Sequence, residues 1–365
     1  MRNKLTICTM LVVLILFTGC RTSELGTEVS VNSNISENEY QESSSYSSTA
    51  PFDMELTMRL VKGSVWIPSE EELKSSFHFS ENASITEANK TGRVIQEDDK
   101  MLSFDQGMVT FIYPNSKIVN SALFIFRNNI AESNYNADKF SQTKDLDFAT
   151  NLEAKQALID LLQKIGKDEA YQVTVYALDA QTMKEQEQVL KSAIGEIQND
   201  MPMVDKWESS YDSYYMQAVP TIDGNPLLPV TTGNSENGSA ITNEMITAIY
   251  TSSGFEFFLM TNAIDITSVE KKEGQLIGEG QARDKFDQLN EALLSTETYQ
   301  VESLQLGYYS EYANTEHTEI VFKPAWQAKT IASGEDESKD SGQYSYYLYQ
   351  YIDAESGQEI VEALG

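Results

Sequence analysis

Cysteine and histidine are scarce in this chain of 365 residues. Its two cysteines are Cys8 and Cys20, so residues 21–365 contain no thiol and can form neither a disulfide nor a cysteine-based metal site. The two histidines, His78 and His317, are far apart in the sequence, which argues against a histidine-rich zinc site. No Gly-x-Ser-x-Gly motif is there to present a serine nucleophile. We therefore expect no enzyme activity, no cofactor and no bound metal.

Basic residues are also few. The chain has 26 lysines and arginines against 56 aspartates and glutamates, a formal net charge of −30. A surface of this charge repels nucleic acid and anionic lipid headgroups, so we expect no nucleic-acid partner and no electrostatic attachment to a membrane. Beyond the first 20 residues, no apolar run approaches the roughly 20 residues that a membrane-spanning helix needs.

The N-terminus carries the clearest pattern. Arg2 and Lys4 precede an apolar run that starts near Leu5 and ends in Thr18-Gly19-Cys20. This arrangement resembles a bacterial lipoprotein signal peptide. The resemblance implies that residues 1–19 are removed and that a diacylglyceryl group on Cys20 anchors the chain to the extracytoplasmic face of the cell membrane. Two acyl chains give stable anchoring, whereas one gives marginal binding.

Residues 20–51 read as a tether. The segment is dominated by Ser, Glu, Asn and Thr, and nothing in it repeats at the period of a helix or a strand. That composition predicts disorder. Fully extended, residues 21–51 reach roughly 100 Å, and as a random coil about 30 Å. We expect the tether to hold a globular body away from the membrane, in or beyond the cell wall.

An internal repeat suggests how the body is divided. Residues 108–126 and 245–259 both read as a strand, a turn and a second strand, which in the first copy is placed at 122–126. Residues 154–178 and 282–306 align without gaps, each reading as an amphipathic helix followed by a strand. Two blocks in the same order favour a duplication.

The repeat predicts an α+β fold with two related units, each packing an amphipathic helix on an antiparallel sheet. We place the N-terminal unit at residues 52–205 and the C-terminal unit at residues 206–365. A helix predicted over 182–199 closes the first unit, because Pro202 follows it and the boundary falls near Asp205.

The C-terminal unit ends in two further strand candidates, 320–329 and 344–352, followed by a turn at 353–357. Pro324 favours an edge or a bulge for the first of these strands. This part of the chain, roughly residues 280–360, resembles exported Firmicute domains of the PepSY and YycH/YycI-like type. The matching residues are Val301, Leu304, Leu306, Gly307, Tyr308, Pro324, Ala325, Trp326, Asp353, Ser356 and Gly357. The resemblance implies a sensory or inhibitory module that binds a protein outside the membrane; it carries over no catalytic residue.

Aromatic residues give the remaining functional hint. Tyr347, Tyr349 and Tyr351 share one face of a strand by alternation. Together with Trp326 they form the binding surface that we predict from the sequence, unless the tyrosines are present only for their β propensity. The predicted function is that of a non-catalytic binding or regulatory module for a protein or peptide of the cell envelope. Two alternatives stay open, a solute- or glycan-binding lipoprotein and a carboxylate-dependent hydrolase.

Overall fold

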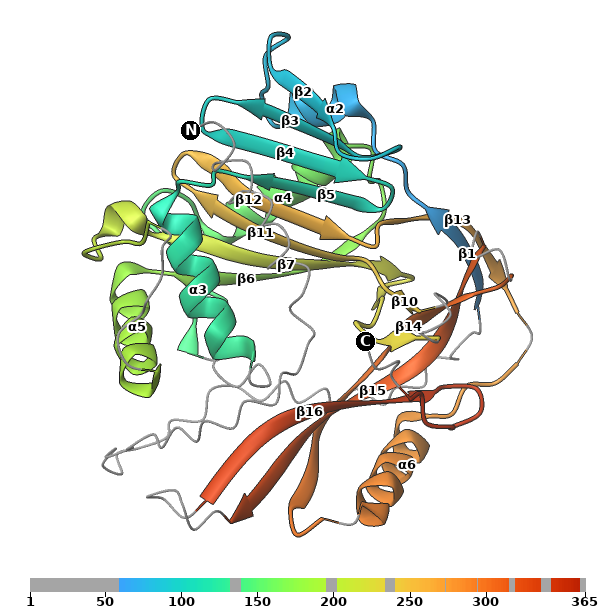
Figure 1. Ribbon diagram of the computed structural model, residues 1–365. Helices are drawn as coiled ribbons and strands as arrows, with labels where there is room; N and C mark the ends of the chain where they lie inside the picture. Colours follow the sequence, from blue (N-terminus) through green and yellow to red (C-terminus); the bar gives the residue numbers. More distant parts are fainter. Residues whose placement is uncertain are drawn as a thin grey trace.

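The structure is a computed structural model that describes residues 59–131, 139–194, 202–233, 240–272, 274–293, 295–314, 319–335 and 343–361. In these ranges the strands form a nine-stranded sheet, a five-stranded sheet and a two-stranded ribbon (Figure 1). All strand pairs are antiparallel, and helices cover the two larger sheets. The α+β class predicted from the sequence is confirmed. No helix in the described ranges is long and apolar enough to cross a membrane.

The large sheet has eight strands in a continuous order, with β8 added beside β7. Across the sheet these are β2 (Ser84–Glu87), β3 (Arg93–Glu97), β4 (Lys100–Asp105), β5 (Met108–Ile112), β12 (Gly254–Thr261), β11 (Met245–Thr251), β7 (Ser213–Ile222) and β6 (Tyr171–Leu178), with β8 at Asn225–Pro226.

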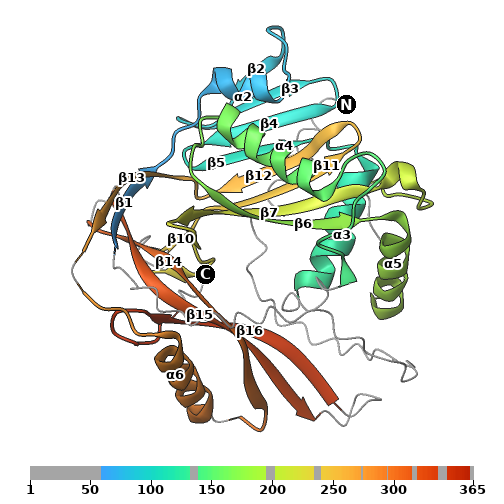
Figure 2. The ribbon, with the colours of Figure 1, turned by 180° about the vertical axis from the view of Figure 1, so that it is seen from behind.

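Alternating residues of the large sheet enter two separate cores, one on each face. Helices α2 (Glu70–Ser76) and α4 (Asn151–Lys164) cover one face, with Leu73 and Leu158 in its core (Figure 2). Helices α3 (Lys117–Ala131) and α5 (Ala180–Ile194) cover part of the other face. A short 3-10 helix, η2 (Ser209–Tyr211), leads into β7.

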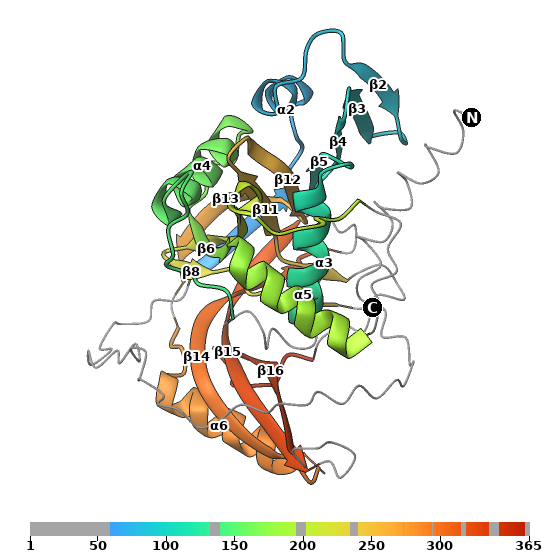
Figure 3. The ribbon, with the colours of Figure 1, turned by 90° about the vertical axis from the view of Figure 1, so that its left-hand side faces the viewer.

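The small sheet lies beyond the β6 edge of the large sheet and carries α6 (Glu279–Ala292) on its outer face (Figure 3). Its order is β13 (Ile264–Lys271), β1 (Arg59–Val65), β15 (Ile320–Glu335) and β14 (Thr298–Tyr312), and β16 (Gln343–Asp353) pairs with β15. The ribbon β9 (Thr231–Thr232) and β10 (Ile241–Thr242) joins the two sheets through a shared apolar core that includes Ile222, Leu227 and Tyr308.

The strand predicted at 122–126 is wrong, because these residues belong to α3. Val119, Ala122 and Phe126 are all buried, and their spacing of three and four residues matches one face of a helix. The first copy of the repeat is therefore a strand followed by a helix, whereas the second is the hairpin β11–β12.

The predicted boundary at residue 205 does not separate the two sheets. Strand β6 precedes residue 205 and β7 follows it, yet they pair along their whole length, from Tyr171↔Pro220 to Leu178↔Ser213. Strand β5 of the first predicted unit pairs with β12 of the second. The helix-strand block recurs as α4–β6 and α6–β14, but its copies lie in different sheets. The sheet topology therefore does not divide the chain into two separate units at residue 205.

Pro324 lies neither at a sheet edge nor at a bulge. Its strand β15 is central, with β14 on one side along most of its length. On the other side, β1 pairs up to Phe322 and β16 pairs from Ala325 onward. Pro324 falls where the partner changes, so its missing N–H removes no ladder hydrogen bond on that side.

Candidate functional site

The four residues of the predicted binding surface do not share one face. Trp326 packs under α6 with Phe286 and Ile352, and its indole donates a hydrogen bond to the Ile277 carbonyl at 3.0 Å. Tyr351 lies on the opposite face of the small sheet, in a core with Leu228, and is 4% exposed. Trp326 and Tyr351 therefore serve packing, and the predicted surface of four residues is wrong in this respect.

Tyr347 and Tyr349 lie on the same face as Tyr351 and are half-buried. The Lys329 ammonium lies 3.6 Å from the centre of the Tyr347 ring and 2.7 Å from a carboxylate oxygen of Glu302. The ring face of Tyr347 is thus already occupied by a cation of the same sheet. Tyr349 packs against the apolar cluster that contains Leu228, Val230 and Tyr351. Cys20, the predicted lipidation site, is outside the described residues.

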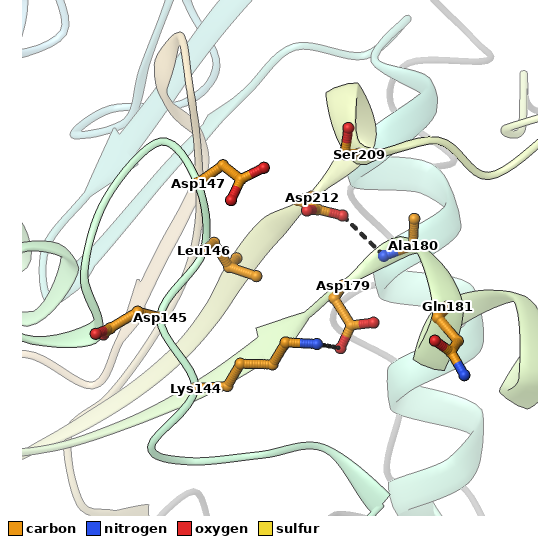
Figure 4. A pocket seen from close by; sticks show the side chains of 9 residues that line it. All are labelled: Lys144, Asp145, Leu146, Asp147, Asp179, Ala180, Gln181, Ser209 and Asp212. Carbon is orange, nitrogen blue, oxygen red and sulfur yellow. Dashed lines mark hydrogen bonds and ion pairs between the residues drawn. The ribbon is translucent and has the colours of Figure 1, made fainter.

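A pocket of about 270 Å³ is present elsewhere, at the start of α5 (Figure 4). Its lining comes from four segments: the loop before α4, the junction of β6 and α5, η2, and the residue that precedes β7. The lining residues are Lys144, Asp145, Leu146, Asp147, Asp179, Ala180, Gln181, Ser209 and Asp212. Four aspartates and one lysine therefore line one small space, and Figure 4 shows the Asp145 carboxylate pointing away from Asp179 and Asp212.

Tyr214 fixes the loop that carries three of these charged residues. Its side chain is completely buried under the large sheet. Its hydroxyl accepts a hydrogen bond from the Leu146 amide at 2.9 Å and donates to the Ala149 carbonyl at 2.9 Å. The Asp145 carboxylate accepts a hydrogen bond from the Asn151 amide at the start of α4, at 2.8 Å. Tyr214 on β7 and Asn151 at the start of α4 thus both hold this loop in place.

Asp179 caps helix α5 from inside the pocket. It accepts hydrogen bonds from the Thr182 amide at 3.1 Å and the Thr182 hydroxyl at 2.8 Å, and the Lys144 ammonium lies 3.0 Å away. Burial alone raises the pKa of Asp179, but the hydrogen bonds from Thr182 and the charge of Lys144 outweigh it and hold that pKa below its ordinary value. Asp179 is consequently ionised, and it neutralises the single lysine of the pocket.

The pKa of Asp212 is shifted in the opposite direction, above its ordinary value. Burial raises its pKa, and the neighbouring charges of Asp179 and Asp147 raise it further, although the Ala180 amide donates it a hydrogen bond at 2.8 Å. The raised pKa of Asp212 reflects burial first; the charges of Asp179 and Asp147 add to it, and the charge of Lys144 acts against it. A cationic group entering the pocket would offset the charges of Asp147 and Asp212. Within the described ranges, no three acidic, histidine or cysteine side chains are arranged to hold a metal ion.

Sequence reasoning missed this pocket because its aspartates come from three segments that only the fold brings together. One local signal was present: Asp179 stands three residues before Thr182 at the start of a helical pattern, as an N-cap does. Tyr211, Tyr214 and Tyr215 stand close together in the sequence, but nothing in the sequence showed that Tyr214, on β7, holds the loop before α4.

The fold and the pocket define an α+β protein of two linked antiparallel sheets with an acidic cavity at a helix start. No family model matches the chain, and no curated protein matches it. Among solved structures, the chain is similar to an uncharacterized protein from Eubacterium rectale ATCC 33656, with a TM-score of 0.59 and 15% sequence identity. The match covers 84% of this chain and 86% of that chain. At this identity the likeness concerns the fold alone.

Proposed function

We propose that this protein is a lipid-anchored, extracytoplasmic binding module whose pocket receives a cationic group from a peptide or protein of the cell envelope. The observation that carries the proposal is the pocket's charge: its one lysine is already paired with Asp179, and Asp147 and Asp212 line the same space beside that pair, while the Asp145 carboxylate is bonded to the start of α4. A cavity of about 270 Å³ suits one lysine or arginine side chain better than a whole drug-sized ligand, which occupies roughly 300–1,000 Å³.

The net charge of the molecule supports the same class of partner. At −30, the chain attracts cationic segments and accelerates their encounter. Asp147 and Asp212 have no lysine partner in the pocket, so they are the groups that an incoming ammonium would meet.

Binding of a short lysine-rich peptide tests the proposal, with the same peptide acetylated on its lysines as the uncharged control. We expect calorimetry to show binding of the first peptide and none of the second. Asp147→Asn and Asp212→Asn should each lower the affinity for the lysine-rich peptide about tenfold, since a hydrogen bond to a charged group contributes about 1.5 kcal/mol. Asp287→Asn, an exposed change on α6, should leave binding unaltered. Equal binding of both peptides would refute the proposal.

A carboxylate-dependent hydrolase is the second candidate, because Asp179 and Asp212 have pKa values shifted in opposite directions within one pocket. Both carboxylates already bind the first turn of α5, however, which favours binding over chemistry. Release of reducing ends from cell-wall glycan fragments, lost in both Asp179→Asn and Asp212→Asn, would favour the hydrolase. Glycan binding that is insensitive to these variants would instead favour a glycan-binding lipoprotein.

A further inference from the structure

Lys167 is a completely buried lysine far from the acidic pocket. It follows the end of α4, and its side chain has no exposed surface. Its ammonium lies 3.1 Å from Glu244 and 3.2 Å from Glu169, and it donates a hydrogen bond to the Ile264 carbonyl at 2.8 Å. The three N–H groups of the ammonium thus have three acceptors.

The partners of Lys167 come from the segments where the chain passes between the sheets. Ile264 begins β13 of the small sheet directly after β12 of the large sheet. Glu244 lies between β10 and β11, where the chain returns to the large sheet. Trp66 follows β1 as the chain enters the large sheet, and its ring lies 5.7 Å from the Lys167 ammonium. The Trp66 amide also donates to the Ala263 carbonyl at 2.9 Å, which ties two of these crossings together.

Glu244 links the same groups a second time. One of its carboxylate oxygens accepts a hydrogen bond from the Tyr171 hydroxyl at 2.9 Å, and the other accepts one from the Ile264 amide at 3.0 Å. Glu244 is therefore bonded to β6 of the large sheet and to β13 of the small sheet at once. We call Lys167, Glu169, Tyr171 and Glu244 the Lys167 cluster.

Away from this junction, the short polar contacts join β14 of the small sheet to the segment that follows β8. The Leu228 amide donates to the Tyr308 carbonyl at 2.8 Å, and the Asn243 side-chain amide donates to the Leu228 and Tyr308 carbonyls, both at 2.8 Å. Direct side-chain contact between β14 and a long strand of the large sheet is weaker. The Gln305 side chain on β14 donates to the Gln172 side chain on β6 at 3.5 Å, at the limit of a hydrogen bond. The apolar core around Ile222 and Tyr308 holds the sheets together, but apolar contacts are non-directional and do not fix an angle as hydrogen bonds do.

We propose that the Lys167 cluster is a charge lock that sets the angle between the large and the small sheet. A lock of this kind explains why Lys167 and Glu244 are buried, with Glu169 half-buried beside them, at a place where apolar residues of similar volume would give equal or greater stability. The cluster supplies orientation rather than net stability. The small sheet, with Tyr347 and Tyr349 on the face away from α6, is held in one position relative to β6.

The distance between the sheets can be measured directly, because residues 21–365 contain no cysteine. In the mature chain with Cys20→Ala, single cysteines replace Ile85 on β2 and Leu293 at the end of α6, which are 46% and 44% exposed. Spin labels at these positions then report the distribution of inter-sheet distances by pulsed electron resonance. The test variant is Lys167→Met. The matched control is Lys272→Met, which removes an exposed ion pair with Glu355, also 3.1 Å long.

We expect one narrow distribution in the parent and in Lys272→Met, and a distribution at least about twice as wide, or displaced, in Lys167→Met. A folded Lys167→Met variant with the parent's distribution would overturn the lock. If Lys167→Met does not fold, it is replaced by the double variant Lys167→Met/Glu244→Gln. This variant also removes the buried carboxylate that would otherwise lack its lysine, and the expected result is the same. Failure of both to fold, beside a folded Lys272→Met, would also overturn it, since the cluster would then maintain the fold rather than the angle.

Discussion

At Gly307 the backbone of β14 in the small sheet lies close against Pro226 and Leu228 beside the large sheet. A Cβ atom at this position would lie 2.5 Å from the Pro226 carbonyl oxygen and 2.6 Å from a methyl carbon of Leu228. The Leu228 amide donates to the Tyr308 carbonyl at 2.8 Å, so this segment cannot move away without losing a hydrogen bond. Glycine is required here by space.

Replacing Gly307 with Ala should therefore destabilise the protein by about 1–3 kcal/mol, the usual cost of overpacking. The free energy of unfolding in urea measures it. Gly280→Ala is the control, because a Cβ there meets nothing within 4 Å and the residue lies in the first turn of α6. We expect it to be neutral or to stabilise by up to about 1 kcal/mol. Equal effects of the two substitutions would contradict the steric argument.

The raised pKa of Asp212 predicts how cation binding depends on pH. An ionised Asp212 attracts a cation and a protonated one does not. Since its pKa lies above the ordinary 3.8, binding should weaken as the pH falls through that raised value, before an ordinary aspartate would protonate. Titrating the affinity for the lysine-rich peptide between pH 7 and 4 measures this. Asp212→Asn should bind more weakly at pH 7 and lose this step; a variant with an unchanged pH profile would show that another group is responsible.

At the scale of single elements, α4 shows a complete capping box. The Thr150 hydroxyl accepts a hydrogen bond from the Glu153 amide at 3.2 Å, and the Glu153 carboxylate accepts one from the Thr150 amide at 2.7 Å. Thr150→Ala should cost about 1 kcal/mol in the free energy of unfolding, as N-cap removal usually does. Thr86→Ala, on the exposed edge strand β2, should change it by less than about 0.5 kcal/mol. A Thr150→Ala variant as stable as the parent would show that the cap is dispensable.

Elements with their own periodicity were predictable from the sequence. The stripe of Ala154, Leu158, Leu161 and Leu162 predicted a helix, and the structure buries all four residues on α4. The helical structure of residues 122–126 was not predictable, because an unbroken apolar run of five residues is compatible with a strand and with a helix. Only the core formed by Val119 and its neighbours decides between the two. The aspartates of the pocket could not be predicted for a related reason: they belong to three segments that lie far apart in the sequence.

At the scale of the whole molecule, strand neighbours far apart in the sequence determine the architecture. Strand β12 pairs with β5, and β15 pairs with β1, across stretches that no local pattern links. The repeat in the sequence predicted two units in succession. Instead the first described strand, β1, belongs to the small sheet, the following strands build the large sheet, and the chain returns to the small sheet at β13, so the two sheets interleave along the sequence. Helix and strand patterns are local, whereas sheet membership is a property of long-range pairing.

The proposed attachment to the membrane concerns the whole molecule and depends on a single residue, Cys20. If Cys20 carries the lipid, Cys20→Ala should release the protein into the medium or leave it as an unprocessed precursor, because a surface with a formal charge of −30 is repelled by anionic headgroups. Cys8→Ala, which changes the other cysteine, should stay in the membrane fraction with the normal mature mass. Fractionation of cells followed by mass spectrometry distinguishes the two. A Cys20→Ala protein that remains in the membrane fraction at the normal mature mass would refute the lipid anchor and leave the pocket proposal intact, since cation binding by Asp147 and Asp212 does not depend on where the chain is held.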